Sequence, residues 1–179
     1  MMSDNPTDKR PCGRITDYLP LIKAANGLTL SQICSMSKLE PSTIQNWIKR
    51  GYVPHPVGKK YTERHLARIL LIAQLRESMQ IDRIGELLRY INGDTDDESD
   101  DIISEQELYD LFCEIAKRLQ SQYPVSVRIG ETVQECVSII ENQSSPKLIF
   151  ALEIMAHTYM ANLYKWEADR LFRDAVTKQ

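Results

Sequence analysis

The chain has 179 residues and a mass of 20.6 kDa, enough for one sizeable domain or two small ones. Hydrophobic residues make up 42% and charged residues 26%, and no apolar run approaches the roughly 20 residues of a transmembrane helix. The four cysteines form no CxxC pair and the three histidines are far apart, so neither a disulfide framework nor a zinc site is indicated. Because the polar start MMSDNPTDKR lacks a secretory signal, we expect a cytoplasmic protein without membrane partners.

The net charge of −3 conceals an uneven distribution along the chain. Residues 28–91 contain ten Lys/Arg against five Asp/Glu, whereas residues 92–122 contain two against ten. A basic segment inside an acidic protein is typical of a phosphate-binding module joined to a part with a different role.

The N-terminal arm, residues 1–27, is expected to be partly disordered. Residues 1–14 are polar and contain two prolines. Residues 15–26 are expected to form a short helix that is bent or interrupted near Pro20, and Gly27 would end it.

Two short helices separated by a tight turn are predicted next. LTLSQICSM has apolar residues at helical spacing, with Thr29 as a plausible N-cap, and Pro41 suits the first turn of a second helix. In that second helix Ile44 and Trp47 share an apolar face, and the remaining positions are polar. This arrangement is a helix-turn-helix candidate.

The segment YVPHPVGKKY suits a small two-stranded wing with Gly58 near its tip. Thr62 is placed to cap a helix over residues 63–79, and residues 81–91 form another. Residues 28–92 are therefore expected to fold as a winged helix-turn-helix with a small β wing.

The remaining chain is predicted to be an acidic linker, residues 93–103, and a helical domain, residues 104–179. Ser104 begins a capping box with Glu107, a second helix spans about residues 128–142, and a long apolar helix follows Pro146. We expect this domain to dimerise, to sense an effector, or both. The predicted fold class is all-α.

Residues 28–91 resemble the winged helix-turn-helix domain of the MerR-type transcriptional regulators. The resemblance rests on TLSQIC, EPSTIQNWIKRGYVP, the wing end KKYT and ARILLIAQLRESMQIDRIGELL. Gln45 and Trp47 stand where that family commonly has arginine and tyrosine, so a different sequence preference is expected. An acidic loop also replaces the start of that family's long dimerisation helix. The whole chain resembles a bacterial family known only as a domain of unknown function.

The resemblance implies that the second helix lies in the major groove of double-stranded DNA. Its early and outward residues would then read bases: Ser42, Thr43, Gln45, Asn46 and Lys49. Phosphates would be bound by Arg50, Lys59, Lys60 and Tyr61. The alternative is a solvated helix face with ordinary wing lysines.

The acidic run DTDDESDD also allows a calcium loop, although its expected glycine position is occupied by Asp101. The ligands would be Asp96, Glu98, Asp100 and Glu107. The alternative is a solvated connector in which Glu107 belongs to the capping box. No catalytic constellation and no cofactor motif stands out, so we expect no enzyme.

The predicted function is sequence-specific DNA binding in transcriptional control by a homodimer that responds to an unidentified effector. An adaptor that keeps the helix-turn-helix fold and binds a protein instead of DNA is the alternative.

Overall fold

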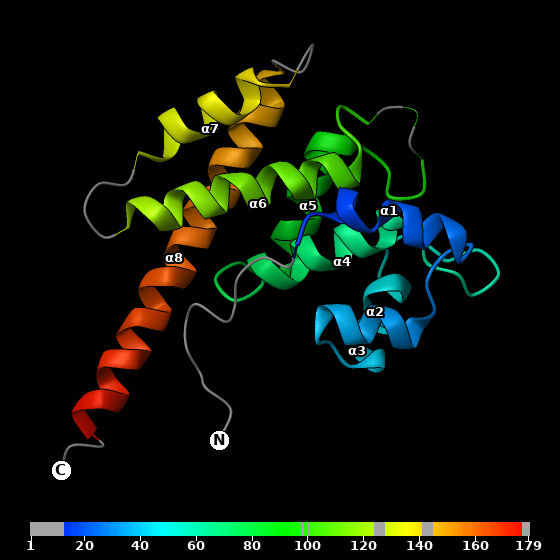
Figure 1. The fold of residues 1–179 in the computed structure, drawn as a ribbon, viewed down its shortest axis with the longest axis horizontal. Coiled ribbons are helices and arrows are strands. Elements are labelled where there is room, and N and C mark those ends of the chain that lie inside the picture. Colours follow the sequence, from blue (N-terminus) through cyan, green and yellow to red (C-terminus); the bar gives the residue numbers. More distant parts are fainter. Residues whose placement is uncertain (1–12, 98, 100, 124–127, 141–144, 177–179) are drawn as a thin grey trace.

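A computed structural model describes residues 13–97, 99, 101–123, 128–140 and 145–176 (Figure 1). The described residues form eight α-helices and no β-strand, which confirms the all-α class. The helices are α1 Ile15–Ala24, α2 Leu30–Ser37, α3 Pro41–Lys49, α4 Glu63–Leu75, α5 Ile81–Asn92, α6 Glu105–Gln122, α7 Ile129–Ser138 and α8 Pro146–Val176. No helix in these ranges combines the length and apolarity that crossing a membrane requires.

Helix α4 is buried along almost its whole length and contacts α1, α2, α5, α6 and α8. Its residues from His65 to Ile72 are all buried, and a helix that is buried on every side is stable only when other elements surround it. The buried side chains of both predicted domains form one continuous cluster from Ile15 to Trp166. The N-terminal and C-terminal helices are therefore fixed to each other through α4.

Helix α1 is held on α6 by a carboxylate. Asp110 Oδ1 accepts the Ile15 amide at 2.6 Å, and its Oδ2 accepts the Thr16 amide at 3.2 Å and the Thr16 hydroxyl. An acidic group at a helix N-terminus satisfies amides that have no partner within the helix and complements the helix dipole. Residues 13–26 are thus an ordered part of the fold, with Pro20 inside the helix.

Helices α2 and α3 begin and end where their sequences place the signals. The Thr29 side chain accepts the Gln32 amide at 3.3 Å while Gln32 Oε1 accepts the Thr29 amide at 2.8 Å, so the predicted N-cap is confirmed as a capping box. Lys38 closes α2 in the left-handed conformation, with φ of 58°. Pro41 occupies the first turn of α3, where its missing N–H costs nothing.

The predicted β wing is not confirmed. Val57 to Lys60 form a tight turn in which the Lys60 amide donates to the Val57 carbonyl at 3.0 Å and both central residues have positive φ. Pairing stops at two isolated bridges, Val57 with Lys60 and Leu28 with Tyr61. A physical reason is the prolines at 54 and 56, which have no amide hydrogen for a ladder.

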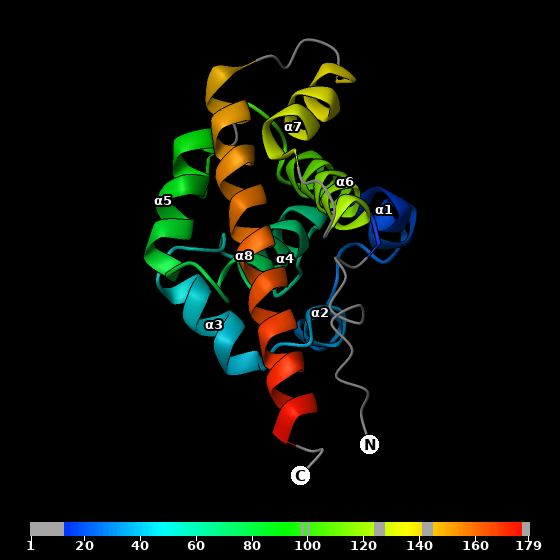
Figure 2. The same cartoon turned by 90° about the vertical axis from the view of Figure 1, so that its left-hand side faces the viewer.

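The long helix α8 lies across α4, α5, α6 and α7 (Figure 2), and its C-terminal turns then leave the body of the protein (Figure 1). Its buried part ends at Trp166, whose indole N–H donates to Glu77 at 2.6 Å. Beyond that point Leu171 and Phe172 are exposed on the projecting turns. The Ser104 cap on α6 is confirmed, since the Ser104 hydroxyl accepts the Glu107 amide at 3.3 Å.

Candidate nucleic-acid interface

Helix α3 has one buried and one exposed face. Ile44 and Trp47 are buried, with Trp47 only 4% exposed, and they anchor the helix on the core. On the other side lie the exposed side chains of Ser42, Gln45, Asn46 and Lys49. These four residues follow the i, i+3, i+4, i+7 spacing of a single helical face. The fifth predicted base-reading residue, Thr43, is half-buried at the edge of this face.

This exposed face has the size and the donors that groove recognition requires. A helix with its side chains is about 10–12 Å across, and the major groove is about 12 Å wide. The amides of Gln45 and Asn46 each carry donor and acceptor groups, which suits bidentate contact with adenine. In Figure 1, α3 lies at the outside of the molecule, at the end opposite α7.

The end of α3 is fixed against α5 by a carboxylate. Gly51, with φ of 73°, reverses the chain, and the hydroxyl of the next residue, Tyr52, donates to Asp82. This hydrogen bond raises the pKa of the Tyr52 hydroxyl. Arg50 also pairs with Asp82, with Nη2 at 3.1 Å from Oδ1, and its guanidinium carbon lies 4.8 Å from the centre of the Tyr52 ring. Arg50 is therefore already paired within the protein.

The other predicted phosphate-binding residues are placed differently from one another. Lys59 is exposed at the tip of the turn. Lys60 is half-buried and reaches back to the C-terminal end of α1, with Nζ 3.5 Å from the Ala25 carbonyl. Tyr61 is only 5% exposed, its ring meets His65 edge to face, and burial raises the pKa of its hydroxyl. Tyr61 therefore lies in the core and outside the exposed surface.

Two further cations border α3 and were missed by sequence reasoning. Arg76 is exposed at the end of α4, and its guanidinium carbon lies 5.6 Å from the centre of the Trp47 ring. Lys38 is exposed in the turn that precedes α3. The basic balance of the segment included both residues, but nothing in the sequence placed Arg76 beside a residue 29 positions earlier.

A buried ion pair connects the end of α3 to α6. Arg68 of α4 and Glu105 of α6 are 2% and 1% exposed and form a direct ion pair. Arg68 Nε also donates to the Tyr52 carbonyl at 2.6 Å, and its Nη2 donates to the Thr95 hydroxyl at 3.2 Å. Thr95 in turn donates to the Gly51 carbonyl at 3.2 Å. Arg68 therefore adds no charge to the surface, although it belongs to the ten cations counted from the sequence.

The acidic segment lies against the residues that follow α3. Asp96 accepts the His55 amide at 3.3 Å, and the Asp97 carbonyl accepts Arg64 at 3.4 Å. Of the four residues of the calcium alternative, Glu107 is bound to the Ser104 cap of α6, whose hydroxyl accepts its amide and donates to its carboxylate, and Glu98 and Asp100 lie outside the described residues. Within the ranges described, no group of three or more His, Cys, Asp or Glu side chains is arranged to hold a metal ion.

The buried imidazole of His65 is expected to make the stability of the folded protein depend on pH. Burial lowers the pKa of its imidazole, and Nδ1 accepts the Thr62 amide at 3.1 Å, which requires the neutral ring. The unfolded chain takes up a proton near pH 6.5 more readily than the folded one, so folding free energy is lost as pH falls below about 6.5.

Between about pH 7.5 and pH 5.5 the wild type is expected to lose free energy of unfolding, in part because of His65. In His65→Gln this loss should be smaller by up to about 1 kcal/mol. Glutamine retains a capping acceptor at this position and does not titrate. Urea denaturation at both pH values measures the effect, and His157→Gln, at an exposed position, is the matched control. An unchanged pH dependence in His65→Gln would exclude this role.

A family of known sequences matches the part of the chain that contains α3 and the turn. Residues 21–112 match the family described as "Domain of unknown function (DUF1836)", slightly more than half of the chain. The chain belongs to the DUF1836 family. The DUF1836 match runs from within α1 to within α6, so it includes α3, the turn and both partners of the buried ion pair.

A curated relative extends the comparison only in part. The DUF1836 chain is 27% identical over 103 residues to a Bacillus subtilis (strain 168) protein whose name is "Uncharacterized protein YkrK". The aligned region covers 55% of this chain and 44% of YkrK, so the chain spans less than half of that relative. No solved structure matched the chain.

Proposed function

We propose that the protein is a sequence-specific regulator of transcription that binds double-stranded DNA through α3. In this proposal α2 and α3 are a helix-turn-helix like that of the MerR-type regulators, and the turn at Val57 to Lys60 takes the place of the wing. Ser42, Gln45, Asn46 and Lys49 face the bases, with Thr43 at the edge.

One observation carries the proposal. The polar side chains of α3 are exposed on a single face, while the opposite face is anchored by buried Ile44 and Trp47. A helix that only covers a core has no need of two neighbouring amides that can each bond bidentately to a base. Lys38 and Arg76 are exposed beside this helix and Lys59 is exposed at the tip of the turn. These three cations are proposed to bind phosphates, which sets position rather than sequence.

A single small reading helix makes few base contacts, so we propose that a homodimer reads a two-part site. Exposed Leu171 and Phe172 on the projecting turns of α8 support association of two copies. The effector is proposed to act through the C-terminal helices.

The test is selection of bound sequences from a random DNA pool at near-physiological salt, with a Gln45→Ala/Asn46→Ala double variant beside the wild type. We expect the wild type to enrich a motif, a palindromic one if the protein binds as a dimer, and the double variant to lose or change it. A wild type that enriches no sequence would contradict the proposal.

Single substitutions distinguish the residues proposed to contact bases from those proposed to contact phosphates. We expect Gln45→Ala or Asn46→Ala to relax sequence preference at a cost of about 1–3 kcal/mol each, and Lys59→Ala to weaken binding to every sequence about equally. Titration of the selected motif and of a scrambled duplex measures both effects. Lys165→Ala, at an exposed position of α8, is the matched control. Equal and uniform losses for all three variants would refute the assigned roles.

The adaptor function is favoured by a different observation. Arg50 is paired with Asp82, Arg64 meets the Asp97 carbonyl and Arg68 is buried, so three cations of the basic segment are engaged within the protein. A surface with few available cations makes few phosphate contacts. DNA affinity that falls less than about tenfold between 50 and 200 mM salt would favour the adaptor, because each phosphate contact contributes to a steep salt dependence.

A further inference from the structure

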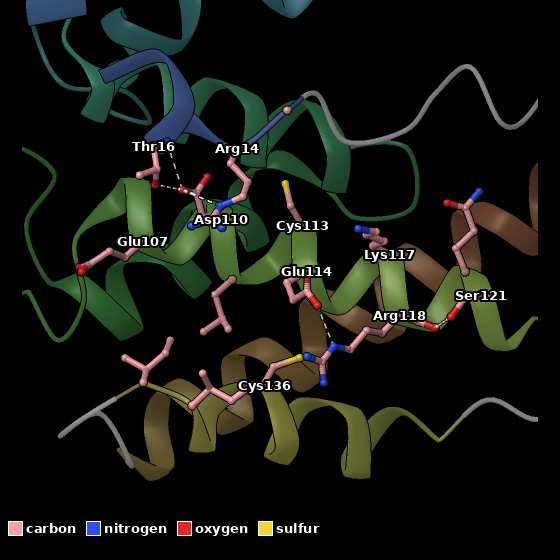
Figure 3. Close-up of a pocket in the computed structure, with 15 residues that line it drawn as sticks. Arg14, Thr16, Glu107, Asp110, Cys113, Glu114, Lys117, Arg118, Ser121 and Cys136 are labelled. Atoms are coloured by element: carbon pink, nitrogen blue, oxygen red, sulfur yellow. Dashed lines mark hydrogen bonds and ion pairs between the residues drawn. The ribbon is translucent and has the colours of Figure 1, made fainter. Parts of the chain in front are cut away.

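A half-open groove lies on the far side of α6 from the core of the protein. Its volume is about 810 Å³, within the range of small-molecule sites. The walls come from three parts of the chain: the residues at the start of α1, one face of α6 and the end of α7 (Figure 3). Nothing in the DNA-binding proposal uses this groove.

The α7 side of the groove is apolar. Cys136, Ile139 and Ile140 at the end of α7 line it together with Leu111 of α6, and Ile139 is 70% exposed. Burial raises the pKa of the Cys136 thiol, so this cysteine is present as a neutral, weakly polar group. This side suits the hydrocarbon part of a ligand.

The carboxylates that line the groove have partners within the protein, whereas, among the residues described, two of its cations are weakly paired or not paired. Among the three acids, Asp110 holds the start of α1, Glu114 pairs with Arg118 at 2.8 Å, and Glu107 accepts the Ser104 hydroxyl. Arg14 is mostly exposed and lies 3.9 Å from Asp110, at the outer limit of an ion pair. Lys117 is exposed and forms no ion pair with any residue that the structure describes. The groove therefore offers two cations to an anion while its acids are already bound.

We propose that this groove binds a small amphipathic carboxylate of the fatty-acid type. The hydrocarbon part lies against Leu111, Cys136 and Ile139, and the carboxylate is held by Lys117 and Arg14. An uncharged ligand would leave these cations unused, and a cationic ligand would find each carboxylate of the groove already engaged by a protein group.

We further propose that the ligand of this groove is the effector of the regulator. This second step rests on the function proposed above. Helix α6 lines the groove from Glu107 to Ser121, and its first residue, Glu105, pairs with Arg68. Arg68 donates to the Tyr52 carbonyl just beyond α3. A ligand that shifts α6 against α1 or α7 acts directly on the ion pair that fixes the end of α3. The same helix thus carries both the ligand site and the connection to the reading helix.

Calorimetric titration of the full chain tests the binding site without DNA. The probe is decanoate below its micelle concentration, with decanol and decyltrimethylammonium for comparison. We expect saturable binding of decanoate only. We expect Lys117→Gln to weaken it about fivefold or more, as the loss of a charge-assisted contact, and Ile139→Asp to weaken it about tenfold, because a carboxylate replaces apolar surface.

Both substituted side chains are exposed, so the variants should fold normally; Lys165→Gln, at an exposed position of α8, and Leu21→Asp, at an exposed position of α1, are the matched controls. No saturable decanoate binding, equal binding of decanol, or equal affinity in the groove and control variants would each overturn the site. If decanoate binds and the selected DNA motif is bound with unchanged affinity in its presence, the effector role fails and the binding site stands. If no DNA motif exists, the calorimetric result is unaffected.

Discussion

Replacing Arg68 with methionine is expected to lower the free energy of unfolding by about 3–5 kcal/mol, the cost of breaking a buried ion pair from one side. The substitution leaves the Glu105 carboxylate unpaired in the core, where it is only 1% exposed: Arg68 binds its Oε1, and its Oε2 has no hydrogen-bond partner among the described residues. It also leaves the Tyr52 carbonyl without the Arg68 donor. Urea denaturation, read as a shift in midpoint at constant slope, measures the effect.

A double-mutant cycle separates the ion pair from the packing. Glu105→Leu should cost a similar amount, because it leaves the Arg68 guanidinium unpaired, whereas Arg68→Met/Glu105→Leu should cost much less than the sum of the two single changes. Additive costs would mean that the two charges do not interact. Arg118→Met, which removes a partly exposed ion pair with Glu114, is the matched control and should cost about 1 kcal/mol or less.

Local signals in the sequence were sufficient for most helix boundaries. Thr29 and Ser104 accept the amides that their capping positions predict, Pro41 lies in the first turn of α3 and Gly51 adopts the left-handed conformation after it. These features depend on residues at most three or four apart, so the sequence contains all the information that they require.

The contacts that join distant segments were beyond sequence reasoning. Arg68 and Glu105 are 37 positions apart, and Asp110 holds the Ile15 amide across 95 positions. A charge count treats such residues as surface charges, because only the packing of α4 and α6 reveals that they are buried and paired. The groove was missed for the same reason, since its walls come from three separated parts of the chain.

The exposure expected of the side chains agrees with the structure on α3 but not in the residues that follow it. The polar and apolar faces of α3 follow from helical spacing alone, and the structure places Gln45 and Asn46 on the exposed face and Trp47 on the buried one. Residues after Gly51 lack a regular period, so nothing in their spacing places Tyr61 in the core or Lys60 at the end of α1. Helical spacing predicts which side chains are buried only within the helix itself.

Replacing Trp47 with alanine is expected to destabilise the protein by about 3–5 kcal/mol, as for other large buried aromatic residues. The ring is 4% exposed, and it also supports the guanidinium of Arg76 at 5.6 Å. Trp47→Phe keeps most of the buried surface and should cost about 1–2 kcal/mol. Gln45→Ala, on the exposed face, should change stability by no more than about 0.5 kcal/mol. Thermal and urea unfolding of the three variants measure these differences.

This contrast decides how a loss of DNA binding is to be interpreted. A variant that is partly unfolded loses affinity for every sequence, so Trp47→Ala should weaken binding without changing the preferred motif. Gln45→Ala should remain as stable as the wild type and bind a less restricted motif, since its side chain touches solvent in the free protein. If Trp47→Ala instead costs no more than Gln45→Ala, the indole is not part of the core, and the division of α3 into an anchoring face and a reading face is wrong.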